Sequence, residues 1–182
     1  SRNRRRTFLT VFSVAVSLSL LGFLLTVYAA FYVRDRPDEQ ILRLVTRHRV
    51  SLTQALPEFY GSRIKVIDGV EEVCIQNWFG GMYKDNRPEN MFARFAVEPD
   101  KIFAVNPEFQ VSPEQLQAFL KNQQAMAISR QLAERQQFEL GQRITIKGDI
   151  YPVDLEFIIH AIVDGAEGPV AFFHWKYLPE SL

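Results

Sequence analysis

The chain has 182 residues, of which 47% are hydrophobic and 23% charged, and these ordinary proportions exclude wholesale disorder. Its 21 Lys and Arg residues balance 21 Asp and Glu residues, so a generally basic nucleic-acid binder is excluded and no nucleic acid is expected as a partner. The single cysteine, Cys74, excludes an intramolecular disulfide framework and a multi-cysteine metal site.

The charges are distributed unevenly along the chain, and they define a candidate membrane anchor. Residues 7–33 contain no charged side chain, four arginines precede this run, and every acidic residue lies at Asp35 or later. Since about 20 apolar residues are enough for a helix to cross a bilayer, residues 7–33 are predicted to span the lipid bilayer. The positive-inside rule then places residues 1–6 in the cytoplasm and residues 34–182 outside. A cleaved signal peptide is the alternative, but its apolar core would be shorter.

Residues 34–182 are predicted to form one domain in which strands and helices are interleaved. The apolar spacing predicts, in chain order, a strand over 41–50, a helix over 54–67, strands over 70–75 and 91–97, a helical turn over 100–105, a helix opening at Ser112-Pro113, a strand over 125–128, a helix capped by Ser129, and strands over 143–147 and 153–163. The predicted fold class is α+β, with one N-terminal transmembrane helix before a mixed α/β extracytoplasmic domain.

No sequence pattern indicates catalysis, a metal site or a cofactor. The three histidines, His48, His160 and His174, are far apart in the chain and lack a cysteine pair, so a zinc site is not expected. Neither a phosphate-binding glycine loop nor a known nucleophile motif is present, so the chain is not expected to bind ATP itself. Cys74 lies in an apolar stretch, which favours a buried inert thiol over a nucleophile. We therefore expect no catalytic, cofactor-binding or metal-binding residue.

One loop has the composition of a contact surface. Residues 76–90 combine aromatic side chains with Gly80-Gly81 and a polar continuation. Trp78, Phe79 and Tyr83 are the candidate residues for contact with a substrate or a partner protein, because aromatic anchors concentrate binding energy at interfaces. The alternative is a loop that folds over the core with its aromatic rings inside, and the composition favours this alternative.

Two stretches of the chain resemble a known family. Residues 126–135 read MAISRQLAER, and residues 138–146 read FELGQRITI. Together they are similar to the strand, capped helix, Leu-Gly step and strand of the periplasmic core domain in FtsX/MacB-like ABC transporter permeases. Residues 64–73, IKVIDGVEEV, are similar to the helix-to-strand transition of the same family. Gly69 and Gly141 lie where both patterns need a sharp backbone turn.

The resemblance implies the permease of an ABC transporter, a noncatalytic subunit of the bacterial inner (plasma) membrane. Such a subunit pairs with a cytoplasmic ABC ATPase subunit, works as a homodimer or heterodimer of permeases, and couples ATP hydrolysis to motion of its periplasmic domain for export or mechanotransmission. Members of the family have four spans, so we expect the chain to be a piece of a longer protein, incomplete at its C-terminus. The alternative is a single-pass membrane sensor or anchor whose outer domain binds a ligand.

Overall fold

The computed structural model describes residues 2–32, 43–51, 54, 56–149 and 153–180. The chain divides into two compact units, residues 1–45 and 46–182. The first unit contains helix α1 (Arg2–Tyr32), within which residues 3–30 are long and apolar enough to cross a membrane. At 1.5 Å per residue this 31-residue helix is about 46 Å long, more than the ~30 Å hydrocarbon core requires. The N-terminal helix predicted from the uncharged run is present.

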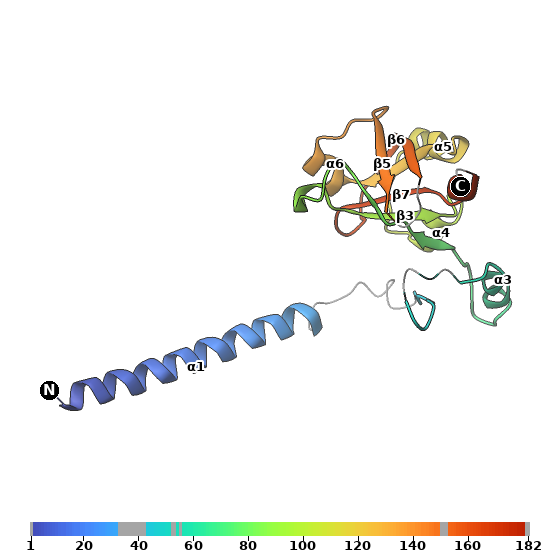
Figure 1. Cartoon of the computed structure of the whole chain (residues 1–182). Helices are drawn as coiled ribbons and strands as arrows, with labels where there is room; N and C mark the ends of the chain where they lie inside the picture. Colours follow the sequence, from blue (N-terminus) through green and yellow to red (C-terminus); the bar gives the residue numbers. More distant parts are fainter. Residues whose placement is uncertain (1, 33–42, 52–53, 55, 150–152, 181–182) are drawn as a thin grey trace. The chain divides into compact units, whose positions relative to one another are not determined.

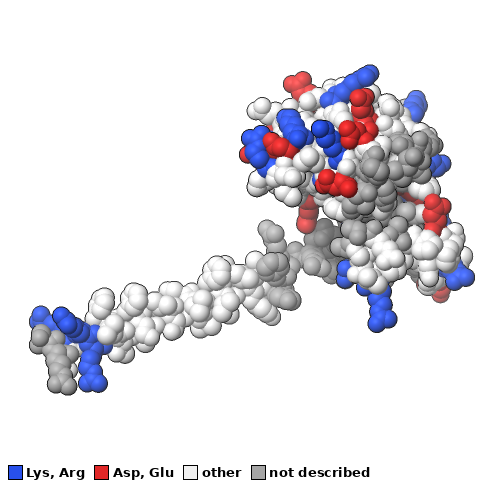
Figure 2. All heavy atoms as spheres, in the orientation of Figure 1, with Lys and Arg blue, Asp and Glu red and all other residues white. Residues whose placement is uncertain are grey.

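Helix α1 accommodates hydroxyl groups of its apolar run by internal hydrogen bonds, as two residues show. Ser19 and Thr26 donate to the carbonyl oxygens of Ala15 and Gly22, each four residues earlier, at 2.9 Å. Bonds of this kind satisfy polar side chains without a partner outside the helix. In Figure 2 the basic side chains gather at the N-terminal end of α1 and the described helix beyond them is uncharged. The described part of α1 therefore has the composition of a membrane span.

The second unit is an α/β domain (Figure 1). Its helices are α3 (Phe59–Lys65), the 3-10 turn η1 (Pro88–Asn90), α4 (Ile102–Val105), α5 (Pro113–Lys121), α6 (Arg130–Gln136) and α7 (Tyr177–Glu180). Its strands are β1 (Gln76–Trp78), β2 (Gly81–Met82), β3 (Ala93–Val97), β4 (Ala125–Ser129), β5 (Arg143–Gly148), β6 (Asp154–Val163) and β7 (Val170–His174). The mixed α/β class predicted from the sequence is confirmed.

The seven strands form one curled sheet in the order β1-β3-β7-β4-β6-β5-β2. Strands β3 and β7 are parallel, as are β4 and β6, whereas the other neighbours are antiparallel. A flat sheet of this order would be about 29 Å wide at ~4.8 Å per strand spacing. However, β1 and β2 are the two edges, and only two residues separate them in the chain, which reach about 11 Å at most. The sheet must therefore curl until its edges nearly meet.

Both faces of the curled sheet are covered by apolar side chains. One core contains Phe79, Phe157 and Phe173 together with Leu132 of α6. The opposite core contains Phe172 of β7, with Ile102 of α4 and Phe119 of α5. Strands β4 and β7 thus present alternate residues to the two cores, which is the arrangement that period-two alternation specifies. Strand β5 instead buries Ile144 and Ile146 on one face and leaves its other face exposed.

The local signals that predicted the second half of the domain are confirmed. The Ser112 hydroxyl accepts a hydrogen bond from Gln115 N at the start of α5, and Ser129 accepts one from Leu132 N at the start of α6. Gly69 and Gly141 have positive φ angles of 87° and 84°, the conformation that glycine adopts most readily. Strands β4, β5 and β6 lie within one residue of their expected limits.

The first half differs from the predictions. Residues 43–48 are not in a strand, and residues 41 and 42 of that predicted strand lie outside the described residues. The helix expected over 54–67 is limited to Phe59–Lys65, and the strand expected over 70–75 begins only at Gln76. These segments lie before the sheet begins at β1, so no sheet neighbour supports the apolar alternation that suggested strands. Strand β7 was not predicted.

Candidate functional site

The loop singled out from the sequence closes the curled sheet. We call residues 76–83 the closing segment, because it leaves one sheet edge at β1 and joins the other at β2. The amide of Phe79 donates to the carbonyl oxygen of Arg94 at 2.9 Å, and the amide of Asp149 donates to the carbonyl oxygen of Gly80 at 3.1 Å. The segment is thus bonded to β3 before it crosses and to the end of the β5 strand afterwards.

Gly81 allows the closing segment to approach β5. A Cβ atom at this position would lie 2.7 Å from the carbonyl oxygen of Lys147, 2.9 Å from Cγ2 of Ile146 and 3.0 Å from Cε1 of Phe79. Real Cβ atoms do not approach other atoms this closely, and the nearest atom belongs to backbone paired within the sheet. Glycine is therefore required here because a side chain has no room. Backbone conformation is not the reason, because the φ angle of Gly81 is outside the left-handed region.

Two of the three candidate aromatic residues belong to the core. Phe79 is fully buried and makes an edge-to-face contact with Phe173, with ring centroids 5.7 Å apart. Tyr83 is buried as well, with its ring 6.0 Å from Phe92 and 5.4 Å from Phe138. The closure of the sheet directs the rings of Phe79 and Tyr83 inward, as the alternative of a loop folded over the core predicts, and the contact role of these two residues stays a prediction. Trp78 lies on edge strand β1 and is only half-buried, so its contact role stays a prediction.

After the closing segment the chain forms a rigid polar tip, residues 84–91. Asp85 accepts hydrogen bonds from Asn90 Nδ2 at 2.6 Å and from Arg87 Nε at 2.7 Å, and Arg87 also pairs with Glu89 at 2.9 Å. The Asn90 hydrogen bond is the main cause that lowers the pKa of Asp85, assisted by Arg87. Since the Asp85 carboxylate stays charged at neutral pH, it offers an ionic contact and is not a general acid.

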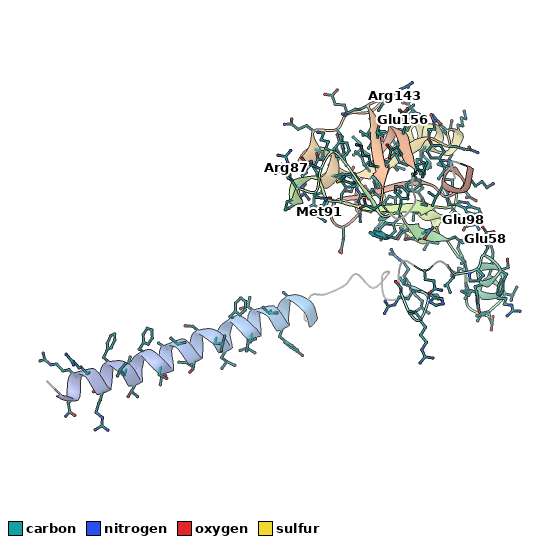
Figure 3. All side chains as sticks on the ribbon, viewed as in Figure 1. Glu58, Arg87, Met91, Glu98, Arg143 and Glu156 are labelled. Atoms are coloured by element: carbon teal, nitrogen blue, oxygen red, sulfur yellow. The ribbon has the colours of Figure 1, made fainter. Side chains whose placement is uncertain are left out.

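The polar tip is anchored to helix α6. Side-chain nitrogens of Arg135 and Gln136 donate to the carbonyl oxygens of Pro88 and Glu89, respectively. Figure 3 shows Arg87 and Met91 at the same end of the domain, and the Met91 side chain is 61% exposed. The tip is thus a fixed, solvent-exposed feature that carries both signs of charge and one apolar residue.

A buried cation lies behind the closing segment, and sequence reasoning missed it. Arg94 of β3 is 8% exposed, and its Nε and Nη1 atoms have no hydrogen-bond partner in the described part of the chain. Burial lowers the pKa of Arg94, while the charge of Asp149 opposes that shift. The guanidinium carbon lies 4.8 Å from the ring centroid of Phe92, and this cation–π contact partly replaces the lost hydration. No sequence signal distinguishes this arginine from the exposed ones.

The other reactive side chains occupy structural positions. Burial raises the pKa of Cys74 to about 11, so its thiol is protonated at neutral pH. His174 is buried, and its Nε2 atom donates to the carbonyl oxygen of Phe119 at 2.6 Å. His160 lies 3.2 Å from the side-chain amide of Asn122. Within the described ranges, His, Cys, Asp and Glu side chains do not gather into a group of three that could hold a metal ion.

The fold has counterparts among solved structures. The extracellular domain of the noncanonic ABC-type transporter YknZ from Gram-positive bacteria matches 69% of this chain with a TM-score of 0.51 and 16% identity. The periplasmic region of MacB from Actinobacillus actinomycetemcomitans matches 71% of the chain, with a TM-score of 0.48 and 10% identity. The chain covers 66% and 59% of these two domains, respectively.

The likeness lies in the structure and not in the sequence. No protein-family model matches the chain, and no curated protein matches it. At 16% identity the match to YknZ establishes the fold. The α/β domain therefore has the fold of the extracellular domain of an ABC-type transporter, which confirms at the level of the fold the resemblance to FtsX/MacB-like permeases.

Proposed function

We propose that the chain is part of a permease subunit of an ABC transporter, noncatalytic in itself and driven by a cytoplasmic ABC ATPase subunit. The observation that carries the proposal is the fold shared with the YknZ extracellular domain in a chain that begins with a candidate membrane span. A helix of this length followed by a folded domain is a means to pass displacement from one side of a membrane to the other.

In this proposal the arginines before the apolar run stay in the cytoplasm and the α/β domain lies outside. The warrant is the positive-inside rule applied to Arg2, Arg4, Arg5 and Arg6. A second permease, identical or related, completes the complex, and nucleotide binding to the ATPase biases the outer domains between two arrangements. Export of a substrate or transmission of force to an outer partner is the result of that motion.

Trp78 and the polar tip are the surface features available for contact with a substrate or partner. Trp78 is half-buried on the edge strand β1, and the tip is anchored by Arg135 and Gln136. Fixed residues lose little conformational entropy on binding, which favours them as contact points. We expect Trp78→Ala to impair transport while the folded domain persists.

The test is purification of the full-length protein from its native membranes under mild detergent conditions. Recovery of an ATP-binding-cassette subunit in stoichiometric amount supports the permease. A matched preparation, in which an unrelated membrane span replaces α1, tests whether association with the ATP-binding-cassette subunit depends on α1. Recovery of no such subunit, together with saturable binding of a small ligand by the full-length protein, would instead establish a sensor.

A further inference from the structure

Helix α3 presents an unusual surface for a helix of a folded domain. None of its seven residues is buried, and Phe59 and Tyr60 are 50% and 41% exposed. Their rings stack with centroids 4.5 Å apart, and the guanidinium of Arg63 lies 5.1 Å from the Phe59 ring centroid. Val66 and Ile67, which follow the helix, are also exposed. The helix and the two residues after it thus expose aromatic, aliphatic and basic side chains to solvent.

Few contacts hold α3 to the rest of the α/β domain. A Cβ atom at Gly61 would lie 3.7 Å from the Ile75 side chain, and Lys65 pairs with Glu72 at 3.0 Å. A helix of seven residues is not stable in water on its own and depends on packing of an apolar face. Its two aromatic side chains, Phe59 and Tyr60, are exposed, whereas Ile64 is half-buried, so a further surface that covers the two rings would stabilise the helix.

The part of the domain that contains α3 is net positive, whereas the part that follows it is net negative. The described residues 46–51, 54 and 56–67, which we call the α3 segment, carry four basic residues and one acidic residue, net +3. Residues 68–182 carry ten basic and 17 acidic residues, net −7. Arg47, Arg49 and Arg63 are exposed within the segment. An anionic surface therefore attracts the α3 segment and repels the remainder of the domain.

We propose that the α3 segment docks on the anionic phospholipid surface of the membrane that α1 spans. Phe59 follows the last residue of α1 by only 27 positions, so the candidate span confines the segment near a bilayer. Exposed Phe and Tyr rings with neighbouring arginines suit the headgroup layer, where ring bodies enter the apolar boundary and cations meet phosphate. A second copy is a poor occupant, because a two-fold interface would place one net-positive segment against another.

Docking through α3 determines which end of the α/β domain faces the lipid. Figure 3 shows Glu58, the residue before α3, far from Arg143 and Glu156, which mark the opposite end of the domain. Docking through α3 therefore keeps β5 and β6 away from the lipid. Docking depends on a membrane and does not depend on an ATPase partner. The docking experiment can therefore fail or succeed independently of the proposed transport function.

The test places one fluorophore in α3 and another at the opposite end. Two separate variants of the full chain are used, Ser62→Cys and Glu156→Cys, each in a Cys74→Ala background. Each variant is labelled with one fluorophore and reconstituted through α1 into vesicles that contain a lipid-borne quencher. The vesicles contain phosphatidylcholine alone, or phosphatidylcholine and phosphatidylglycerol in equal amounts. We expect strong quenching at position 62 in the anionic vesicles, less in the neutral ones, and little at position 156 in either.

Matched variants separate charge from general damage. Each arginine near an anionic surface contributes about fivefold to the ratio of docked to free protein, so Arg47→Gln with Arg49→Gln lowers that ratio by about 25-fold. The control pair, Arg143→Gln with Lys147→Gln, removes the same charge from β5 and leaves the ratio unchanged. Tyr60→Ser is expected to weaken docking in both kinds of vesicle.

Three results would overturn the proposal. The first is equal quenching at positions 62 and 156, and the second is quenching at position 62 that does not respond to phosphatidylglycerol. The third is a loss of quenching at position 62 as the protein-to-lipid ratio rises, to the same extent in neutral and anionic vesicles. That result would mean that a second copy of the chain covers the surface. The comparison of neutral with anionic vesicles uses otherwise unaltered α3 residues, so it decides the matter even where a variant fails to fold.

Discussion

Replacement of Gly81 by alanine tests whether closure of the sheet depends on a close backbone approach. The added methyl group would lie 2.7 Å from the carbonyl oxygen of Lys147 and 2.9 Å from Cγ2 of Ile146. Extra atoms in a packed site cost about 1–3 kcal/mol. The nearest atom here is backbone of β5, which is paired on both sides, and it cannot turn away as a side chain can. We expect Gly81→Ala to lower the free energy of unfolding by about 2–3 kcal/mol.

A matched glycine within the same domain provides the control. A Cβ atom at Gly61 would have its nearest neighbour, Cδ1 of Ile75, at an ordinary 3.7 Å, and the residue lies inside α3. Alanine favours a helix over glycine by about 1 kcal/mol, so Gly61→Ala is expected to leave stability unchanged or to raise it slightly. The same chemical change thus has opposite expected signs at the two positions.

The assay is urea unfolding of the full chain in detergent micelles, followed by the fluorescence of Trp78 and Trp175. Trp78 reports directly on the closing segment, and Trp175 follows strand β7. A lower midpoint for Gly81→Ala, with an unchanged slope, is the expected result. Equal midpoints for wild type and Gly81→Ala, or equal losses for the two glycine variants, would refute the account of how the sheet closes.

The remaining predictions concern side chains of the cores. Phe79→Ala should lower the free energy of unfolding by about 3–5 kcal/mol, and Trp78→Ala by less than half as much, in the same urea assay; a larger loss at Trp78 would place that ring in the core. Burial lowers the pKa of His174 from its ordinary value of 6.5, so the unfolded chain binds a proton more readily and stability falls as pH drops below about 6.5. Unfolding midpoints measured from pH 7.5 to pH 5 should lose part of this slope in His174→Asn, and an equal slope in both proteins would contradict the assignment. With a pKa raised to about 11, the Cys74 thiol should react with a maleimide at pH 7 at least about tenfold more slowly in the folded chain than in urea, and equal rates would show that it is accessible and ionised.

The sequence predicts those parts of the fold that local residues determine. Ser112 and Ser129 mark helix starts because a hydroxyl can accept a bond from a free amide three residues later, and this requires no knowledge of distant contacts. Gly141 marks a turn for an equally local reason. The β4–α6–β5 region, on which the family resemblance largely depends, was therefore predicted almost residue by residue.

The elements that were missed depend on contacts far apart in the chain. Strand β7 is buried at every position and pairs with β3 and β4, so it shows no alternation that would identify it. The same cause explains the closing segment, because only the position of β1 and β2 at opposite edges turns Phe79 and Tyr83 inward. Arg94 was missed since the sequence does not reveal that its strand is covered on that face.

The most direct test of the proposed function is the distance between the outer domains of the two permeases that the proposed complex contains. Spin labels at Glu156→Cys, in a Cys74→Ala background, report that distance by pulsed electron resonance in the full-length complex. The exposed position on β6 carries the label without disturbing either core. We predict one distance distribution without nucleotide and a shifted one with a non-hydrolysable ATP analogue. An identical distribution in both states, in a complex that retains its ATPase subunit, would contradict the coupling of this domain to ATP.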